Sequence, residues 1–168
     1  TIDEAINLAS TFSSQIIIEE YIKGREITVG ILGNKALPII EIIPDSKFYD
    51  YDSKYKKGKC KYNELIDIDS NLIRKIQDDS LRIYKNLGCR HYARVDFILD
   101  EEGNHNFLEI NTLPGMTSTS LLPMAAKNAG LKSILVKTGY EGEDGQYKVK
   151  PDYVSENLYQ AIKSIVVW

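Results

Sequence analysis

The fold is decided by two consecutive stretches, HYARVDFILD at residues 91–100 and NHNFLEIN at residues 104–111, joined by the tripeptide EEG. Both stretches contain β-branched or aromatic residues that alternate with polar ones, as the two faces of a strand require. The connecting tripeptide ends in glycine and is turn material. The pattern therefore predicts a β-hairpin.

Two polar pairs occur in this hairpin. Arg94 and Asp96 are two residues apart, as are Glu109 and Asn111, so each pair projects from one face of its strand. If those faces coincide, two carboxylates and an amide oxygen form a set of ligands that suits Mg²⁺, beside an arginine that would stabilise developing negative charge. The same spacing also fits a solvated sheet face with an Arg–carboxylate pair. Spacing alone leaves both interpretations open.

Periodicity predicts the other elements, which follow from apolar residues at helical spacing or from runs of β-branched residues. A short helix is expected near residues 2–9, a long one at 72–87, one at 120–129 and one at 157–166. Strands are expected at residues 16–22, 26–32 and 35–43, as an antiparallel meander with turns at 23–25 and 33–34, and at 134–136. Residues 44–64 lack periodicity and are expected to form a long polar loop.

Composition excludes several classes of protein. The 168 residues carry a net charge of −3 without a basic stripe, so nucleic acid is not an expected partner. The longest apolar stretches are far too short to cross a bilayer, so we expect no membrane association and a cytoplasmic location. The two cysteines, Cys60 and Cys89, form no CxxC pair and predict neither a disulfide nor a zinc site.

Longer strings carry a family resemblance. They are GCRHYARVDF at residues 88–97, FLEINTLPGMT at 107–117, IEEYIKGRE at 18–26, FYDYDSKY at 48–55 and SLLPMAA at 120–126. Together they closely resemble the D-alanine–D-alanine ligase family of the ATP-grasp superfamily, from residue 1 to about residue 131. The resemblance implies an α+β ATP-grasp catalytic subdomain, with a mainly antiparallel sheet and packed helices.

The resemblance also implies a reaction for peptidoglycan precursor synthesis. ATP phosphorylates the carboxylate of one D-alanine, and the amine of a second D-alanine attacks the acylphosphate. By this match Asp96, Glu109 and Asn111 would ligate two Mg²⁺ ions, for which Mn²⁺ could substitute. Arg94 would stabilise the tetrahedral intermediate.

The nucleotide contacts implied by the resemblance lie upstream and in the hairpin. Glu19 would accept a hydrogen bond from the adenine amino group, and the backbone of Tyr21 and Ile22 would meet the ring edge. Glu26 would bind the ribose hydroxyls, and Leu108 would lie beneath the adenine. Without the resemblance, the two glutamates read equally well as exposed strand charges and Leu108 as a core residue.

Two further groups of residues are assigned by the same match. Gly115, Ser120 and Leu121 would bind the second D-alanine, although a helix entrance capped by serine is the alternative. Lys54 would contact the transferring phosphate, and Tyr55 would help a loop to close over the acylphosphate, although both also fit a solvated loop. The match around Tyr55 is to ligases with an amine acceptor, which favours D-alanine over D-lactate.

The chain departs from the family pattern in two places. In the family the first D-alanine site, the dimer surface, a phosphate-covering loop and two ATP-binding lysines precede the segment that matches Thr1. We therefore expect that a complementary amino-terminal half or a homodimer is needed. Beyond about Leu131 the sequence resembles the end of a haloacid-dehalogenase-like phosphatase, but residues 132–168 contain no DxD nucleophile motif.

We accordingly expect two units, a catalytic subdomain at residues 1–131 and a divergent or fused strand-loop-helix tail at 132–168. The expected function is ATP-dependent ligation of two D-alanines, with ATP and D-alanine as the small-molecule partners. Two alternatives stay open. One is a non-catalytic fragment that binds Mg-nucleotide, and the other is a different ATP-grasp carboxylate–amine ligase.

Overall fold

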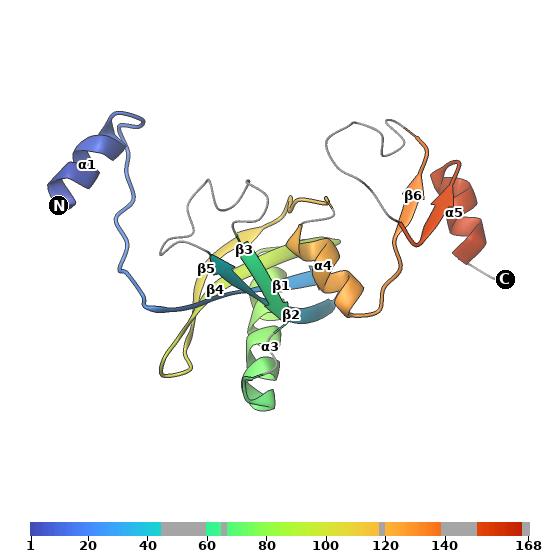
Figure 1. Ribbon diagram of the computed structural model, residues 1–168, viewed down its shortest axis with the longest axis horizontal. Coiled ribbons are helices and arrows are strands. Elements are labelled where there is room, and N and C mark those ends of the chain that lie inside the picture. Colours follow the sequence, from blue (N-terminus) through green and yellow to red (C-terminus); the bar gives the residue numbers. More distant parts are fainter. Residues whose placement is uncertain (45–59, 65–66, 118–119, 139–150, 166–168) are drawn as a thin grey trace.

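A computed structural model describes residues 1–44, 60–64, 67–117, 120–138 and 151–165 (Figure 1). The elements, in chain order, are α1 (Ile2–Ser10), β1 (Gly24–Leu32), β2 (Lys35–Pro44), β3 (Cys60–Glu64), α3 (Ser70–Asn86), β4 (Tyr92–Asp100), β5 (His105–Asn111), α4 (Leu121–Asn128), β6 (Ile134–Val136), β7 (Tyr153–Ser155) and α5 (Leu158–Ile165). No helix within these residues is long and apolar enough to span a membrane.

The centre of the molecule is a five-stranded sheet with the order β3-β2-β1-β4-β5. Every neighbouring pair in it is antiparallel. β1 and β2 are joined by the two-residue turn Gly33-Asn34, and Gly33 has a φ of 61°, which a glycine adopts without strain. β4 and β5 form the expected hairpin, so the α+β class with a mainly antiparallel sheet is confirmed.

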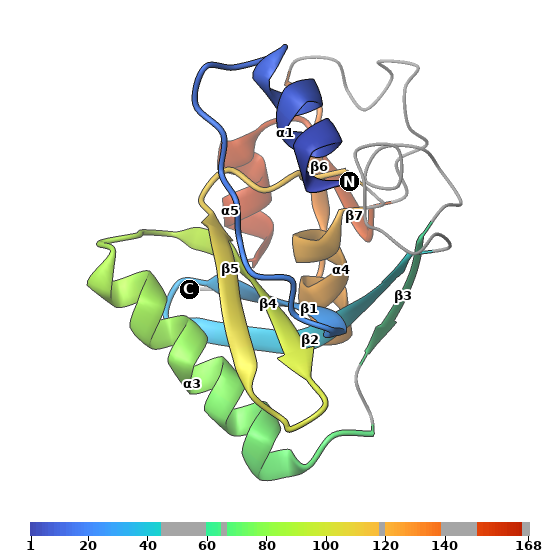
Figure 2. The ribbon, with the colours of Figure 1, turned by 90° about the vertical axis from the view of Figure 1, so that its left-hand side faces the viewer.

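One helix covers each face of this sheet (Figure 2). Asp69 caps the start of α3, because its carboxylate accepts hydrogen bonds from the backbone of Asn71 and Leu72. It packs on the face formed by the odd-numbered residues of β1 and β4. The buried residues of this core are Ile27, Val29, Ile31, Ile39, Ile76, Tyr84, Ala93, Val95, Phe97 and Leu99.

α4 lies against β1 and β2 on the opposite face. Gly30 of β1 allows the helix to come close, because a Cβ added there would lie 2.8 Å from Leu122 Cδ1 and 3.0 Å from Leu37 Cδ1. The buried residues of this smaller core are Leu37, Ile40, Ile42, Leu121, Leu122 and Ala125. The same face carries the polar residues of β4 and β5.

Three expectations about the strands are wrong. Residues 16–22 form no strand, and Ile17 and Ile18 are 85% and 72% exposed. The turn expected at residues 23–25 is absent as well, because β1 already begins at Gly24. β3 (Cys60–Glu64) lies inside the expected polar loop, as a short polar strand at the edge of the sheet.

The two ends of the described chain extend away from the sheet (Figure 1). α1 has a capping box at Thr1 and Glu4 but no buried residue. In the tail, β6 and the unexpected strand β7 form a two-stranded parallel sheet that contacts α5. Residues 139–150, within the loop of the expected strand-loop-helix tail, lie outside the described residues.

Candidate functional site

The register of three strands brings the polar pairs of the hairpin to one face. Asp96 lies directly opposite Glu109, and Arg94 directly opposite Asn111, across β4 and β5. On the other side of β4, Asp96 lies opposite Thr28 of β1. Directly opposed residues in an antiparallel pair point to the same face of the sheet. The four side chains predicted to converge therefore do lie on one face.

A β-bulge shapes the β5 side of this site. The register shifts after Asp96, so that Phe97 pairs with Phe107 while Asp96 pairs with Glu109. Leu108 is the extra residue between them. In a regular strand Leu108 would point away from the face that carries Glu109, but here both residues line the same pocket. The bulge thus places an apolar side chain beside the carboxylates.

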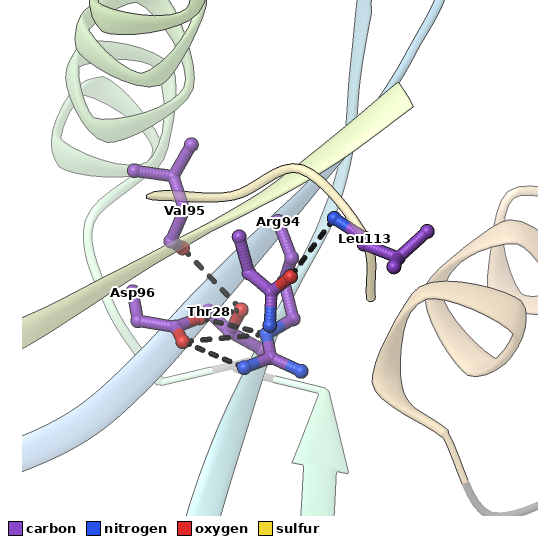
Figure 3. Close-up of polar contacts among 6 residues, drawn as sticks. Thr28, Arg94, Val95, Asp96 and Leu113 are labelled. Carbon is purple, nitrogen blue, oxygen red and sulfur yellow. Dashed lines mark hydrogen bonds and ion pairs between the residues drawn. The ribbon is translucent and has the colours of Figure 1, made fainter. Parts of the chain in front are cut away.

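Asp96 is held by charged and polar donors (Figure 3). Arg94 donates from Nη2 to Oδ2 at 2.8 Å and from Nε to Oδ1 at 3.0 Å. Thr28 donates from Oγ1 to Oδ1 at 2.5 Å. The side chains of Arg94 and Asp96 are only 15% and 6% exposed. The Arg–carboxylate pair of the alternative interpretation is thus present, but it is buried rather than solvated, whereas Glu109 on the same face is exposed.

The pocket beside Asp96 has a volume of about 230 Å³ and is lined by Glu19, Glu26, Asp96, Leu108 and Glu109. Four of these five residues are carboxylates. They come from the segment before β1, from β1 itself, from β4 and from β5. Residues that are 90 positions apart in the sequence thus meet at one concave site.

Tyr21 and Ile22, the other two residues expected at the nucleotide, lie between Glu19 and the start of β1. Tyr21 is 74% exposed and Ile22 is half-buried, and neither belongs to the pocket lining. The contacts expected of these two residues are made by the backbone, so the positions of their side chains do not test them.

The donor set of the pocket is suited to a hard cation. Its polar lining consists of carboxylates. Asn111 is not part of this lining but lies on the same face, opposite Arg94, and its Oδ1 accepts a hydrogen bond from the Leu113 amide at 3.0 Å. Within the residues that the structure describes, no three His, Cys, Asp or Glu side chains come close enough to hold a metal by themselves. A cation with few protein ligands that completes its shell with water and phosphate, as Mg²⁺ does, fits this arrangement.

The residues expected at the second D-alanine meet at the start of α4. A Cβ added to Gly115 would lie 2.7 Å from Ser120 Oγ, so a larger residue would displace that hydroxyl. Ser120 precedes α4 but does not cap it with its side chain, because its Oγ instead accepts from the Thr117 amide at 3.0 Å. The side chain of Leu121 is buried in the core, which leaves only its backbone for a ligand.

Lys54 and Tyr55, expected on a closing loop, lie outside the described residues. Thr28 was not expected at the site. The signal for it was its position two residues after Glu26, which puts both side chains on one face of β1.

Comparison with known proteins accounts for this geometry. The family model described as D-ala D-ala ligase C-terminus matches residues 1–138. The chain belongs to this family. A second model, of HAD-hydrolase-like proteins, matches residues 124–161, so the two matches overlap on α4 and β6. Both resemblances expected from the sequence are therefore found.

Among members of the D-alanine ligase family, the D-alanine–D-alanine ligase of Aquifex aeolicus is 49% identical over 119 residues, which cover 71% of this chain and 40% of that protein. The crystal structure of the Bacillus anthracis D-alanine–D-alanine ligase complexed with ATP matches with a TM-score of 0.62 and 41% identity, over 76% of this chain and 43% of the other. The VanG D-Ala:D-Ser ligase of Enterococcus faecalis matches with a TM-score of 0.66 and 37% identity, over 77% and 39%.

These relatives extend well beyond the matched part. The chain spans less than half of the length of the curated ligases from Aquifex aeolicus and Trichlorobacter lovleyi, 40% and 48% respectively. The solved relatives have the ATP-grasp fold, and the sheet of this chain is the corresponding part of it.

Proposed function

We propose that this chain supplies the phosphate-binding and metal-binding part of an ATP-dependent D-alanine–D-alanine ligase, which acts for peptidoglycan precursor synthesis through a D-alanyl phosphate. A complementary amino-terminal half would supply the rest of the site. Residues 1–131 form the catalytic subdomain in this proposal, and residues 132–168 form a fused tail. Family membership supports the proposal, together with the ATP complex of the Bacillus anthracis relative.

The observation that carries the proposal is the pairing of Asp96 with Glu109 at a pocket of about 230 Å³. Arg94 balances the charge of Asp96, and the further carboxylates that line the pocket favour the binding of additional positive charge. Four carboxylates from four segments line this one space, which a hydrophobic core would not hold. A nucleotide with its divalent cations supplies both the positive charge and the shape that such a pocket accepts.

In this proposal Asp96, Glu109 and Asn111 hold the cations. Bound Mg²⁺ would neutralise charge on the phosphates during transfer. Arg94 is held beside Asp96 by three hydrogen bonds, so its guanidinium is fixed before the substrate arrives and can stabilise an anionic intermediate without reorganising.

The nucleotide and the acceptor take the neighbouring positions. Glu19, Glu26 and Leu108 surround the base and ribose side of the pocket, with the Tyr21 and Ile22 backbone beside the ring. Gly115, Ser120 and Leu121 bind the acceptor amino acid at the start of α4. Lys54 and Tyr55 act from the loop that lies outside the described residues.

The metal assignment is tested by titration calorimetry of Mg-ATP into the wild-type chain, Asp96→Asn and Glu109→Gln. Each variant removes a charged oxygen ligand at nearly constant volume, so we expect the affinity to fall by roughly tenfold or more. Asp78→Asn and Glu102→Gln are matched controls, because both side chains are exposed and lie outside the pocket. Equal affinity in the wild type and both site variants would remove Asp96 and Glu109 from the metal site.

The identity of the acceptor needs a separate comparison. The similarity to a D-Ala:D-Ser ligase keeps D-serine as a competing acceptor. Supplying D-alanine, D-serine and D-lactate in parallel to the reconstituted enzyme distinguishes the three, and we expect D-alanine to give the highest kcat/KM. If the chain binds Mg-ATP but supports ligation of none of them, it is the non-catalytic nucleotide-binding fragment.

A further inference from the structure

Thr28 is a buried hydroxyl at the centre of the site. It lies on β1 directly opposite Asp96 and is 1% exposed. Its Oγ1 is 2.5 Å from Asp96 Oδ1 and 3.3 Å from the Val95 carbonyl oxygen. A hydroxyl has one proton to donate, and the shorter contact to the charged acceptor takes it (Figure 3). Thr28 therefore acts on the carboxylate of Asp96.

The hydrogen bonds of Asp96 can be counted oxygen by oxygen. A carboxylate has about four acceptor positions, two on each oxygen. Oδ1 accepts from Thr28 Oγ1 and from Arg94 Nε, which fills both of its positions. Oδ2 accepts from Arg94 Nη2 at 2.8 Å. Nε also donates to Oδ2 at 3.3 Å, so its single hydrogen is shared between the two oxygens, with the shorter contact to Oδ1. Oδ2 is thus the less occupied of the two oxygens.

This count restricts how Asp96 can bind a cation. Oδ1 has two short contacts and Oδ2 has one short and one long contact, so Oδ2 is the oxygen more open to a coordination shell and the carboxylate is a ligand through one oxygen. Mg²⁺ takes carboxylates in this way, within a tight octahedron that it completes with water and phosphate oxygens. Ca²⁺ is larger, takes six to eight oxygens and often binds a carboxylate through both of its oxygens.

We infer that Thr28 is a positioning residue that keeps Asp96 a one-oxygen ligand and so makes the site prefer Mg²⁺, and the similar Mn²⁺, over Ca²⁺. The inference rests on the proposed function, because it takes Asp96 as a metal ligand. Without the hydroxyl, Oδ1 regains an acceptor position, and Arg94 alone then holds the carboxylate. Both oxygens then become available to a larger cation.

Four variants separate the hydroxyl from the shape of the side chain. Thr28→Val keeps the branched shape and removes the hydroxyl, whereas Thr28→Ser keeps the hydroxyl and removes the methyl group. Thr28→Ala removes both groups. If the valine variant does not fold, a comparison of Thr28→Ala with Thr28→Ser gives the effect of the hydroxyl instead. Thr138→Val is the matched control, because Thr138 is exposed and lies outside the pocket.

The measurement is Mn²⁺ binding to the 168-residue chain, followed by electron paramagnetic resonance of the free ion, and then displacement by Mg²⁺ and by Ca²⁺ in separate titrations. In the wild type, Thr28→Ser and Thr138→Val we expect Mg²⁺ to displace Mn²⁺ at lower concentration than Ca²⁺. In Thr28→Val and Thr28→Ala the ratio of the two displacement constants should shift toward Ca²⁺ by about tenfold, since a hydrogen bond to a charged group is worth roughly that factor.

The outcomes separate this inference from the proposed function. If Asp96→Asn binds Mn²⁺ as tightly as the wild type, or the wild type binds none, Asp96 is not a metal ligand and both fall. If binding depends on Asp96 but the ratio is the same with and without the hydroxyl, only the role of Thr28 is overturned. If the role of Thr28 were purely structural, removing the hydroxyl would lower the thermal stability and weaken the binding of all three cations equally. The unchanged ratio of the displacement constants would reveal this.

Discussion

Replacing Arg94 with methionine is predicted to destabilise the folded chain through Asp96. Methionine keeps much of the length and apolar surface of the arginine stem but has no charge and no N–H donor. Asp96 would then retain only the hydrogen bond from Thr28, while its side chain stays 6% exposed. The variant therefore leaves a buried carboxylate without its counter-charge.

The magnitude follows from the contacts that are lost. Three hydrogen bonds, at 2.8, 3.0 and 3.3 Å, join the guanidinium to the carboxylate. Removing one partner of a buried ion pair costs about 3 kcal/mol or more, because the remaining charge is left desolvated. Replacing both charges removes that penalty, so Arg94→Met combined with Asp96→Asn should cost less than the sum of the single variants by about 2 kcal/mol.

The assay is equilibrium unfolding in urea at neutral pH, without added metal, on the wild type, both single variants and the double variant. Arg90→Met is the matched control, because Arg90 is exposed and precedes β4. We expect the control to stay within about 0.5 kcal/mol of the wild type. A loss below that limit for Arg94→Met, or full additivity in the double variant, would refute the buried pair.

Two other predictions concern the packing of α4 and the loop. Gly30→Ala should lower the free energy of unfolding in urea by about 1–3 kcal/mol, because its Cβ would be 2.8 Å from the buried Leu122 Cδ1. Strict additivity of this loss with that of Leu122→Ala would contradict the close packing. The loop is tested in a ligase that has been completed with an amino-terminal half. There, Lys54→Ala should lower kcat more than it lowers the affinity for ATP. Tyr55→Phe should raise the ratio of phosphate released to dipeptide formed, because water gains access to the acylphosphate. Unchanged turnover in Lys54→Ala and an unchanged ratio in Tyr55→Phe would favour the alternative interpretation, in which both residues belong to a solvated loop.

The hairpin could be predicted from sequence because its signal is local. Strand alternation puts Arg94 with Asp96, and Glu109 with Asn111, on shared faces, and a short turn makes the two strands neighbours. The bulge at Leu108 could not be predicted in this way. An extra residue leaves the composition of a strand unchanged and alters only which face each side chain meets.

The errors elsewhere have a different physical cause. Residues 16–22 have the composition of a strand. However, β1 already pairs with β2 on one side and with β4 on the other, so neither edge of β1 is left for these residues to pair with. β3 was missed because an edge strand can be polar on both sides. The contribution of Thr28 depends on the register between β1 and β4, which pairs residues 68 positions apart and is not encoded in either strand alone.

The most direct test of the central claim is reconstitution with the complementary amino-terminal part of the Aquifex aeolicus ligase, measuring phosphate release and D-alanyl-D-alanine formation from ATP and D-alanine. We predict that each part alone forms no detectable dipeptide, that the mixture forms phosphate and dipeptide in equal amounts, and that Asp96→Asn in this chain abolishes both. Dipeptide synthesis by the isolated chain, or a mixture whose activity is indifferent to Asp96→Asn, would contradict the account.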